Sequence, residues 1–218
     1  MPIINMVYKK KWKWKPWANT IAYYPLNANF NDYSDNSYTL TNDGWAITPL
    51  SWVSCSYFTL NWKAYNNSVS FGTTRTISLW FSPYQSGTNW VMVWTWWNWS
   101  INTTVFAVAV WNNNSLDISN YYNKWVQSNT TISDGSWNYW CVVATWWNVK
   151  IYLNWTSVKT SSFALNSGGR IMLWYRWDNG GDGRYQWYLS NVIVEDKART
   201  AQEVSDYYNQ TKWNYWIS

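Results

Sequence analysis

The chain has 218 residues, enough for one substantial all-β domain or two small ones, and only 12% of its residues are charged. Much of its formal net charge of +5 comes from one lysine cluster near the amino terminus. The remainder is close to neutral, which argues against a nucleic-acid surface spread over the fold, and no apolar run is long enough to span a membrane.

Residues 1–19 are predicted to form a basic flexible arm, followed by a single domain over residues 20–212. Tryptophans alternate with lysines up to Trp17, in a stretch that no core could bury, as expected for a solvated tail. Contact between this arm and phosphates is the alternative. The first residues lack the basic start and long apolar stretch of a secretion signal, so export by the usual route is not visible. The lysines of the arm are Lys9, Lys10, Lys11, Lys13 and Lys15.

From Thr20 onward, short strand-like segments alternate with polar turns, and this alternation is typical of an antiparallel β-sandwich. The first strand, Thr20 to Leu26, precedes the turn from Asn31 to Asn36. Near the carboxyl end Thr200 precedes Glu203 by three positions, a capping box that predicts one short helix. The other predicted strands span residues 57–61, 68–71, 75–83, 91–95, 104–110, 115–119, 126–132, 138–145, 149–154, 157–164, 170–175 and 185–195.

Trp155 does not fit its surroundings, because Asn154-Trp155 joins two predicted strands where a tight hairpin turn favours Asn-Gly. The chain has 24 Trp and only 9 Gly, and similar pairs or doublets occur elsewhere in loop-like contexts. We hypothesise that many of these tryptophans correspond to UGA codons that the source organism reads as glycine. The alternative is a genuine aromatic binding surface. The other suspect positions are Trp12, Trp14, Trp17, Trp62, Trp90, Trp96, Trp97, Trp99, Trp146 and Trp147, whereas Trp80 and Trp137 lie in strand patterns that suit an indole.

With glycine at those positions, the order of motifs resembles the laminin G-like, concanavalin A-like jelly-roll family from about Thr20 to Thr211. This resemblance implies a two-sheet antiparallel jelly roll with one short carboxyl-terminal helix. The stretches that carry it are Tyr24–Asn27 with Asn31–Ser34, then Thr76–Phe81, then Ser136–Tyr139 with Lys150–Trp155, and finally Gln186–Val194 with the helix from Thr200.

The residue types give enzyme activity little support. Some relatives with this fold hydrolyse glycosidic bonds with two carboxylates on one strand, but the only glutamates here are Glu195 and Glu203. The absence of histidine removes the usual base for a serine or cysteine nucleophile and the commonest zinc ligand. Cys55 and Cys141 both fall in strand-like segments, and whether they pair stays open.

Calcium is the expected metal, if there is one, because polar turns offer the oxygen ligands that it prefers. Candidate ligands are Asp32, Asp35 and Asn36, although the same residues are ordinary turn formers. The resemblance implies acidic partners on the last strand, where this chain has Ser190 and Asn191 instead.

Carbohydrate is the first expected ligand, because aromatic faces stack on sugar rings while nearby polar side chains bind hydroxyls. We therefore expect a non-catalytic recognition or adhesion module at a cell or virion surface. A structural module of a phage tail or cell-surface assembly that binds neighbouring protein is the alternative, and a glycoside hydrolase is a third. The candidate ligand-binding residues are Tyr121, Tyr122, Tyr175, Arg176, Asp178 and Arg184.

Overall fold

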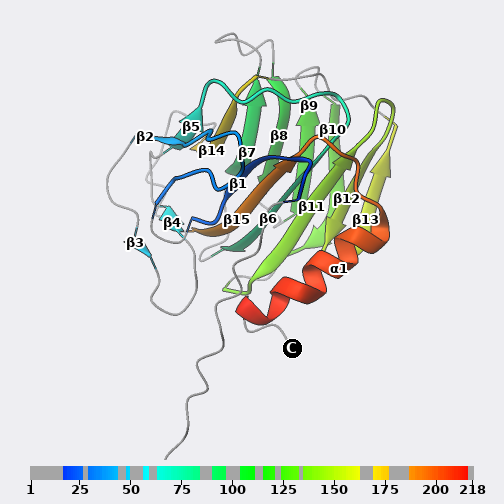
Figure 1. The fold of residues 1–218 in the computed structure, drawn as a ribbon. Helices are drawn as coiled ribbons and strands as arrows, with labels where there is room; N and C mark the ends of the chain where they lie inside the picture. Colours follow the sequence, from blue (N-terminus) through cyan, green and yellow to red (C-terminus); the bar gives the residue numbers. More distant parts are fainter. Residues whose placement is uncertain are drawn as a thin grey trace, which may run out of the picture.

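The computed structural model of the chain describes residues 17–26, 29–43, 48–49, 56–58, 63–83, 90–96, 104–110, 115–120, 124–132, 135–162, 169–176 and 187–215. Figure 1 shows the strands and helices that these residues form. The strands are β1 (Thr20–Tyr24), β2 (Thr41–Asp43), β3 (Thr48–Pro49), β4 (Ser56–Phe58), β5 (Lys63–Asn66), β6 (Arg75–Pro83), β7 (Trp90–Trp96), β8 (Thr104–Val110), β9 (Ser115–Asn120), β10 (Lys124–Thr131), β11 (Asn138–Ala144), β12 (Val149–Leu153), β13 (Thr156–Ser161), β14 (Ile171–Arg176) and β15 (Trp187–Glu195). The helices are α1 (Ala201–Thr211) and the 3-10 helix η2 (Lys212–Tyr215).

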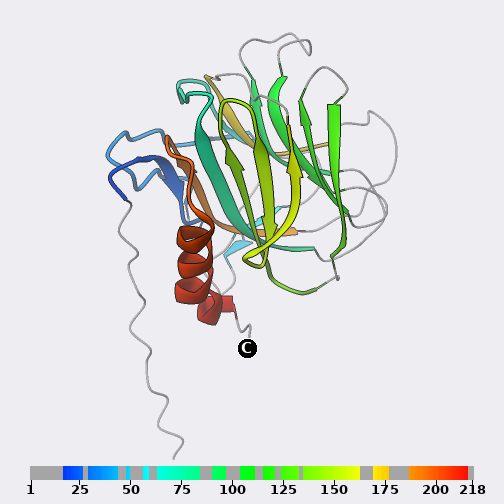
Figure 2. The same cartoon turned by 90° about the vertical axis from the view of Figure 1, so that its right-hand side faces the viewer.

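The described strands form two antiparallel sheets. One has eight strands in the order β13-β12-β11-β6-β15-β4-β3, with β1 also paired to β15. The other has seven strands in the order β10-β9-β8-β7-β14-β5-β2. Figures 1 and 2 show the two layers, with α1 alongside the eight-stranded sheet. The predicted antiparallel two-sheet sandwich with one short carboxyl-terminal helix is therefore confirmed.

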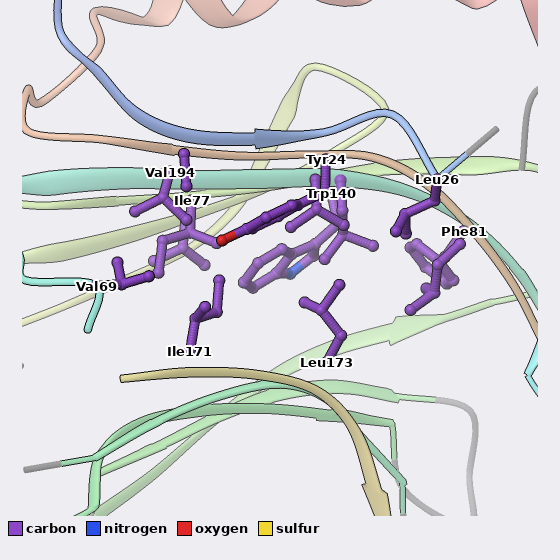
Figure 3. Packing of buried hydrophobic residues seen from close by; sticks show 14 of the residues in the cluster. Tyr24, Leu26, Val69, Ile77, Phe81, Trp140, Ile171, Leu173 and Val194 are labelled. Carbon is purple, nitrogen blue, oxygen red and sulfur yellow. The ribbon is translucent and has the colours of Figure 1, made fainter. Parts of the chain in front are cut away.

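The main core lies between the two sheets. Ile77, Leu79 and Phe81 alternate along β6 and belong to this cluster, as the two-residue period of a strand requires. Figure 3 shows Trp140 of β11 near the middle, between residues of the eight-stranded sheet and Leu173 of β14. Every residue of β6 is buried, because its other face is covered as well.

A second cluster, largely aromatic, covers the outer face of the eight-stranded sheet beneath α1 and η2. Trp80 is fully buried there and stacks on Tyr215 at a ring-centroid distance of 4.2 Å. Its Nε1 donates a hydrogen bond of 3.2 Å to Thr211 Oγ1. Buried indoles normally find such a partner for their N–H group, so the interpretation of Trp80 as an indole that belongs in its strand is consistent with the packing.

Helix α1 begins at the predicted capping box. Thr200 Oγ1 accepts a hydrogen bond from the Glu203 backbone N–H, and Glu203 Oε2 accepts one from the Thr200 N–H at 2.8 Å. Val204, Tyr207 and Tyr208 form the buried face of the helix, as their helical spacing predicts. Local signals in the sequence are therefore enough to locate this helix.

The predicted strand over residues 68–71 is wrong. Asn66 Oδ1 accepts hydrogen bonds from the backbone N–H groups of Ser68 and Val69 at 2.7 and 3.1 Å, which turns the chain there. The strand lies earlier, at β5, and the short strands β2 and β3 were not predicted either. β5 is polar, and it is held by pairing with the distant strands β2 and β14 rather than by its own pattern.

The packed region extends past both predicted bounds of the domain. Trp17, which the sequence places in the solvated arm, lies 5.5 Å from the Tyr207 ring, centroid to centroid. Tyr215, beyond the predicted end at residue 212, is buried. Within the described ranges, no helix is both long and apolar enough to cross a membrane.

Candidate functional site

The polar turn after β1 is organised around the carboxylate of Asp32. Its Oδ1 accepts hydrogen bonds of 2.8 Å from the backbone N–H groups of Tyr23 and Ser34. Its Oδ2 accepts hydrogen bonds of 2.7 Å from the Ser34 hydroxyl and the Tyr38 N–H. Oδ1 thus ties the turn to β1, whereas Oδ2 holds the turn together internally.

The other two predicted metal ligands lie in the same turn. The amide of Asn36 donates a hydrogen bond of 2.8 Å to the Ile21 carbonyl oxygen, and Asp35 is exposed. Within the part of the chain that the structure describes, no three His, Cys, Asp or Glu side chains gather where they could hold a metal ion. Calcium binding at Asp32, Asp35 and Asn36 stays a prediction.

Two of the predicted ligand-binding residues lie in a described element. Tyr175 and Arg176 are the last residues of β14 and pair with Val91 and Trp90 of β7. The remaining four fall outside the described residues: Tyr121, Tyr122, Asp178 and Arg184.

Strand register shows where Arg176 lies relative to the two ends of the seven-stranded sheet. Arg176 pairs with Trp90, Trp90 with Val110, and Val110 with Leu116 near the start of β9. Tyr121 follows the last residue of β9. Arg176 therefore lies at the end of the seven-stranded sheet where β9 begins, and β9 ends at the opposite end of that sheet.

Glu195, one of the chain's two glutamates, forms a buried ion pair. Its Oε2 accepts a hydrogen bond from Arg199 Nε, and both side chains are 2% exposed. Burial raises the pKa of Glu195 to about 7, and the charge of Arg199 only partly offsets this effect. The Arg199 guanidinium also lies 3.6 Å from the centroid of the Trp17 ring, a cation–π contact that the sequence did not reveal.

Glu203 and Cys141 are the other described groups considered for catalysis, and neither is available for it. Glu203 caps α1 and forms an ion pair with Lys197. Burial raises the pKa of the Cys141 thiol to about 12, which keeps this free cysteine protonated and unreactive at neutral pH. Cys55 lies outside the described residues. The chain's two glutamates are thus held in an ion pair and a helix cap.

A cluster of three aromatic rings and one amide group lies where η2 meets the eight-stranded sheet, and we call it the aromatic shelf: Trp137, Tyr188, Asn191 and Tyr215. The ring centroids of Trp137 and Tyr215 are 4.7 Å apart, and those of Trp137 and Tyr188 are 6.2 Å apart. Asn191 Nδ2 donates a hydrogen bond of 2.6 Å to the Tyr215 hydroxyl. All but Tyr215 are half-buried, so the shelf borders solvent.

Sequence reasoning found only part of this shelf. The strand pattern predicts a genuine indole at Trp137, and Asn191 stands out only because the resembled family places acidic residues there. The pairing of residues 137, 191 and 215 depends on η2 folding back over β6 and β15, which no local pattern reveals. The residue type at position 191 is the one local signal, because Asn adopts a left-handed backbone conformation more readily than most residues.

The described tryptophans divide according to backbone conformation. Asn154 and Trp155 have φ values of +48° and +67°, as an Asn-Gly hairpin turn would, and Trp155 is 51% exposed. Trp155 is the one described tryptophan with a positive φ. Trp146 and Trp147, at the β11–β12 turn, are 57% and 70% exposed without needing glycine's backbone.

Two suspect tryptophans do not lie in loops. Trp90 and Trp96 are the first and last residues of β7, paired with Val110 and Thr104 of β8, so the prediction of a loop at these two positions is wrong. A residue that follows a turn-like sequence can still begin or end a strand, because pairing with a distant strand holds it in the sheet. The local sequence does not reveal that pairing.

Comparisons with solved structures show that other proteins share this fold. Domain 4 of AbnA, a GH43 extracellular arabinanase from Geobacillus stearothermophilus, was solved in complex with arabinotriose and has a TM-score of 0.68 at 15% identity, over 86% of this chain and 97% of that one. Botulinum neurotoxin type C, whose cell entry depends on interaction with two ganglioside molecules, has a TM-score of 0.68 at 12% identity, over 88% of this chain and 51% of that one.

A third structure is the binding domain of botulinum neurotoxin DC in complex with rat synaptotagmin II, with a TM-score of 0.66 at 12% identity over 88% of this chain and 51% of that one. The chain thus spans about half the length of the toxin chains that it matches. No protein-family model matches the sequence, and neither does any curated protein. At these identities the likeness shows the fold alone.

Proposed function

We propose that this chain is a non-catalytic carbohydrate-binding domain that acts at a cell or virion surface. The observation that carries the proposal is the match in fold to an arabinanase domain solved with arabinotriose, which spans 97% of that domain. A whole-domain match of this kind is consistent with a self-contained binding module. The ganglioside interaction of botulinum neurotoxin type C, whose chain shares the fold, lends further support.

The positions of the two glutamates favour a binding role over hydrolysis. A glycosidase needs two carboxylates about 5 to 10 Å apart across the scissile bond. Glu195 is buried against Arg199, and Glu203 is fixed in the helix cap. Neither glutamate is placed as a nucleophile or an acid beside an open strand face.

A glycan array tests this proposal. The purified chain is applied to immobilised oligosaccharides that include arabinotriose, once with calcium and once with EDTA. We expect binding to at least one class of sugar, and a signal that disappears in EDTA would support the predicted calcium site. Failure to bind any sugar in either condition would overturn the carbohydrate proposal.

A protein-binding module of a phage tail or cell-surface assembly is the second candidate. It is favoured by the structure of the binding domain of botulinum neurotoxin DC, which shares this fold and was solved in complex with the protein rat synaptotagmin II. An array with no sugar binding, together with a stable complex recovered with a protein of the same surface assembly, would favour this candidate.

We also propose that Trp155 stands where the source organism places glycine. The positive φ of +67° and the 51% exposure of its side chain support this proposal, because an indole gains little there and glycine carries no strain. The codon provides the test. UGA at position 155 is expected, and UGG would overturn the proposal.

A further inference from the structure

Two strained backbone positions meet beside the aromatic shelf. Asn191 has φ +49° and Leu26 has φ +57°, in the left-handed region that Asn tolerates and Leu rarely adopts. They are neighbours through Pro25, whose carbonyl oxygen accepts a hydrogen bond of 3.3 Å from the Asn191 N–H. Residues held in this way cost free energy, and such strain concentrates at binding and catalytic sites.

The strain in β15 has a clear geometric effect. The pairing of β15 with β6 shifts register between Ser190 and Ile193, so Asn191 lies in a bulge. A bulge redirects the side chain that it carries, and here the Asn191 amide lies between two tyrosine hydroxyls. Its Oδ1 accepts a hydrogen bond of 2.8 Å from Tyr23, and its Nδ2 donates one of 2.6 Å to Tyr215.

These two hydrogen bonds hold the amide rigid but use only part of its hydrogen-bonding capacity. An asparagine amide has two N–H donors and two acceptor lone pairs, and the two tyrosine bonds use one of each. Asn191 is half-buried, so part of this residue remains accessible to solvent. A rigid donor–acceptor pair of this kind suits the adjacent hydroxyls of a sugar ring.

The rings of the shelf supply the apolar half of such a site. Trp137, just before β11, is half-buried and lies 4.7 Å from the Tyr215 ring, centroid to centroid. Tyr188 of β15 is also half-buried and flanks Trp137 at 6.2 Å. Because Tyr215 also bonds Asn191, the buried Tyr215 side chain links the half-buried rings to the amide in one cluster.

The fold explains why these residues meet. Tyr188 pairs with Ser82 of β6, and Ser190 pairs with Trp80. Because Trp80 stacks on Tyr215 of η2, Tyr188 lies two residues along β15 from the position under η2. Figure 1 shows α1 running along this sheet to the carboxyl end of the chain. The shelf therefore lies on the outer face of the eight-stranded sheet, beside the end of the helix and away from the core between the sheets.

We propose that the aromatic shelf binds a neutral sugar residue, whose ring stacks on Trp137 and whose hydroxyls bond the Asn191 amide. This inference rests on the proposed carbohydrate-binding function and names its site and ligand class. The polar groups of the shelf are an amide and hydroxyls. Such groups recognise sugar hydroxyls, whereas a sialic acid carboxylate calls for a cationic partner.

Two variants test the site without endangering the fold. Asn191→Gly removes the amide while glycine adopts φ +49° without strain. Trp137→Leu removes the indole but keeps an apolar side chain against Tyr215. Trp147→Ala, which deletes an indole 70% exposed at the β11–β12 turn, is the matched control. Circular dichroism and thermal unfolding confirm that each variant folds.

Binding is measured on an array of neutral oligosaccharides, among them arabinotriose, with sialylated counterparts alongside, and the strongest sugar is then titrated by calorimetry. We expect a neutral sugar to bind, with affinity falling at least about tenfold in Asn191→Gly and in Trp137→Leu and unchanged in Trp147→Ala. The Trp137 indole N–H resonance should shift on titration.

Each other result identifies what is wrong. Wild-type affinity in both shelf variants would overturn the shelf but leave carbohydrate binding intact. Binding restricted to sialylated sugars would overturn the ligand class. No binding of any sugar by the wild-type chain would overturn the proposed function and the shelf with it.

Discussion

Replacing Trp155 with glycine should stabilise the protein, which is unusual for the loss of a large side chain. At φ +67° the Cβ of Trp155 lies close to backbone oxygen, and relief of this contact is worth about 1 to 2 kcal/mol. Glycine offsets about 0.5 to 1 kcal/mol of that gain, because its greater flexibility stabilises the unfolded chain. The indole is 51% exposed, so few contacts are lost.

The net expectation is a gain of about 0.5 to 1 kcal/mol in the free energy of unfolding, or a melting temperature higher by about 1 to 4 °C. Trp155→Ala is the matched control, because it removes the indole but keeps the Cβ that causes the strain. Urea unfolding of the two variants and the wild type gives the comparison. If the glycine variant is no more stable than the alanine variant, strain at this turn does not explain the misfit.

Three further changes have definite expected outcomes. Asp32→Ala should lower the free energy of unfolding by about 2 kcal/mol or more in EDTA, because four hydrogen bonds end on its carboxylate, and a larger loss in calcium is the result that the predicted metal site requires. Because burial raises the pKa of Glu195 from 4.5 to about 7, the folded state holds that proton longer than the unfolded state, so stability should fall as pH rises between these values and level off above them. Glu195→Gln should flatten that part of the profile in unfolding titrations at several pH values, and an unchanged slope would assign it to other groups. Trp80→Ala should cost about 3 to 5 kcal/mol in chemical unfolding, and a loss below 1 kcal/mol would mean that the layer under the helix repacks freely.

Features set by neighbouring residues could be predicted from the sequence. The Asn154–Trp155 turn, the capping box at Thr200 and the long strand β6 all depend on local conformational preference or on alternation along a few residues. The same local reasoning failed at Lys63–Asn66. That strand is polar and exists because β2 and β14 pair with it.

Composition and local pattern thus determined the fold class, the helix and the turn at which Trp155 is a misfit. Tertiary structure alone decided what the individual side chains do. It placed Arg199 between Glu195 and the Trp17 ring, and it brought Asn191 between tyrosines that are 168 residues before it and 24 residues after it. Hydrogen bonds and ring contacts over such separations depend on how sheets and helix pack, and no window of neighbouring residues carries that information.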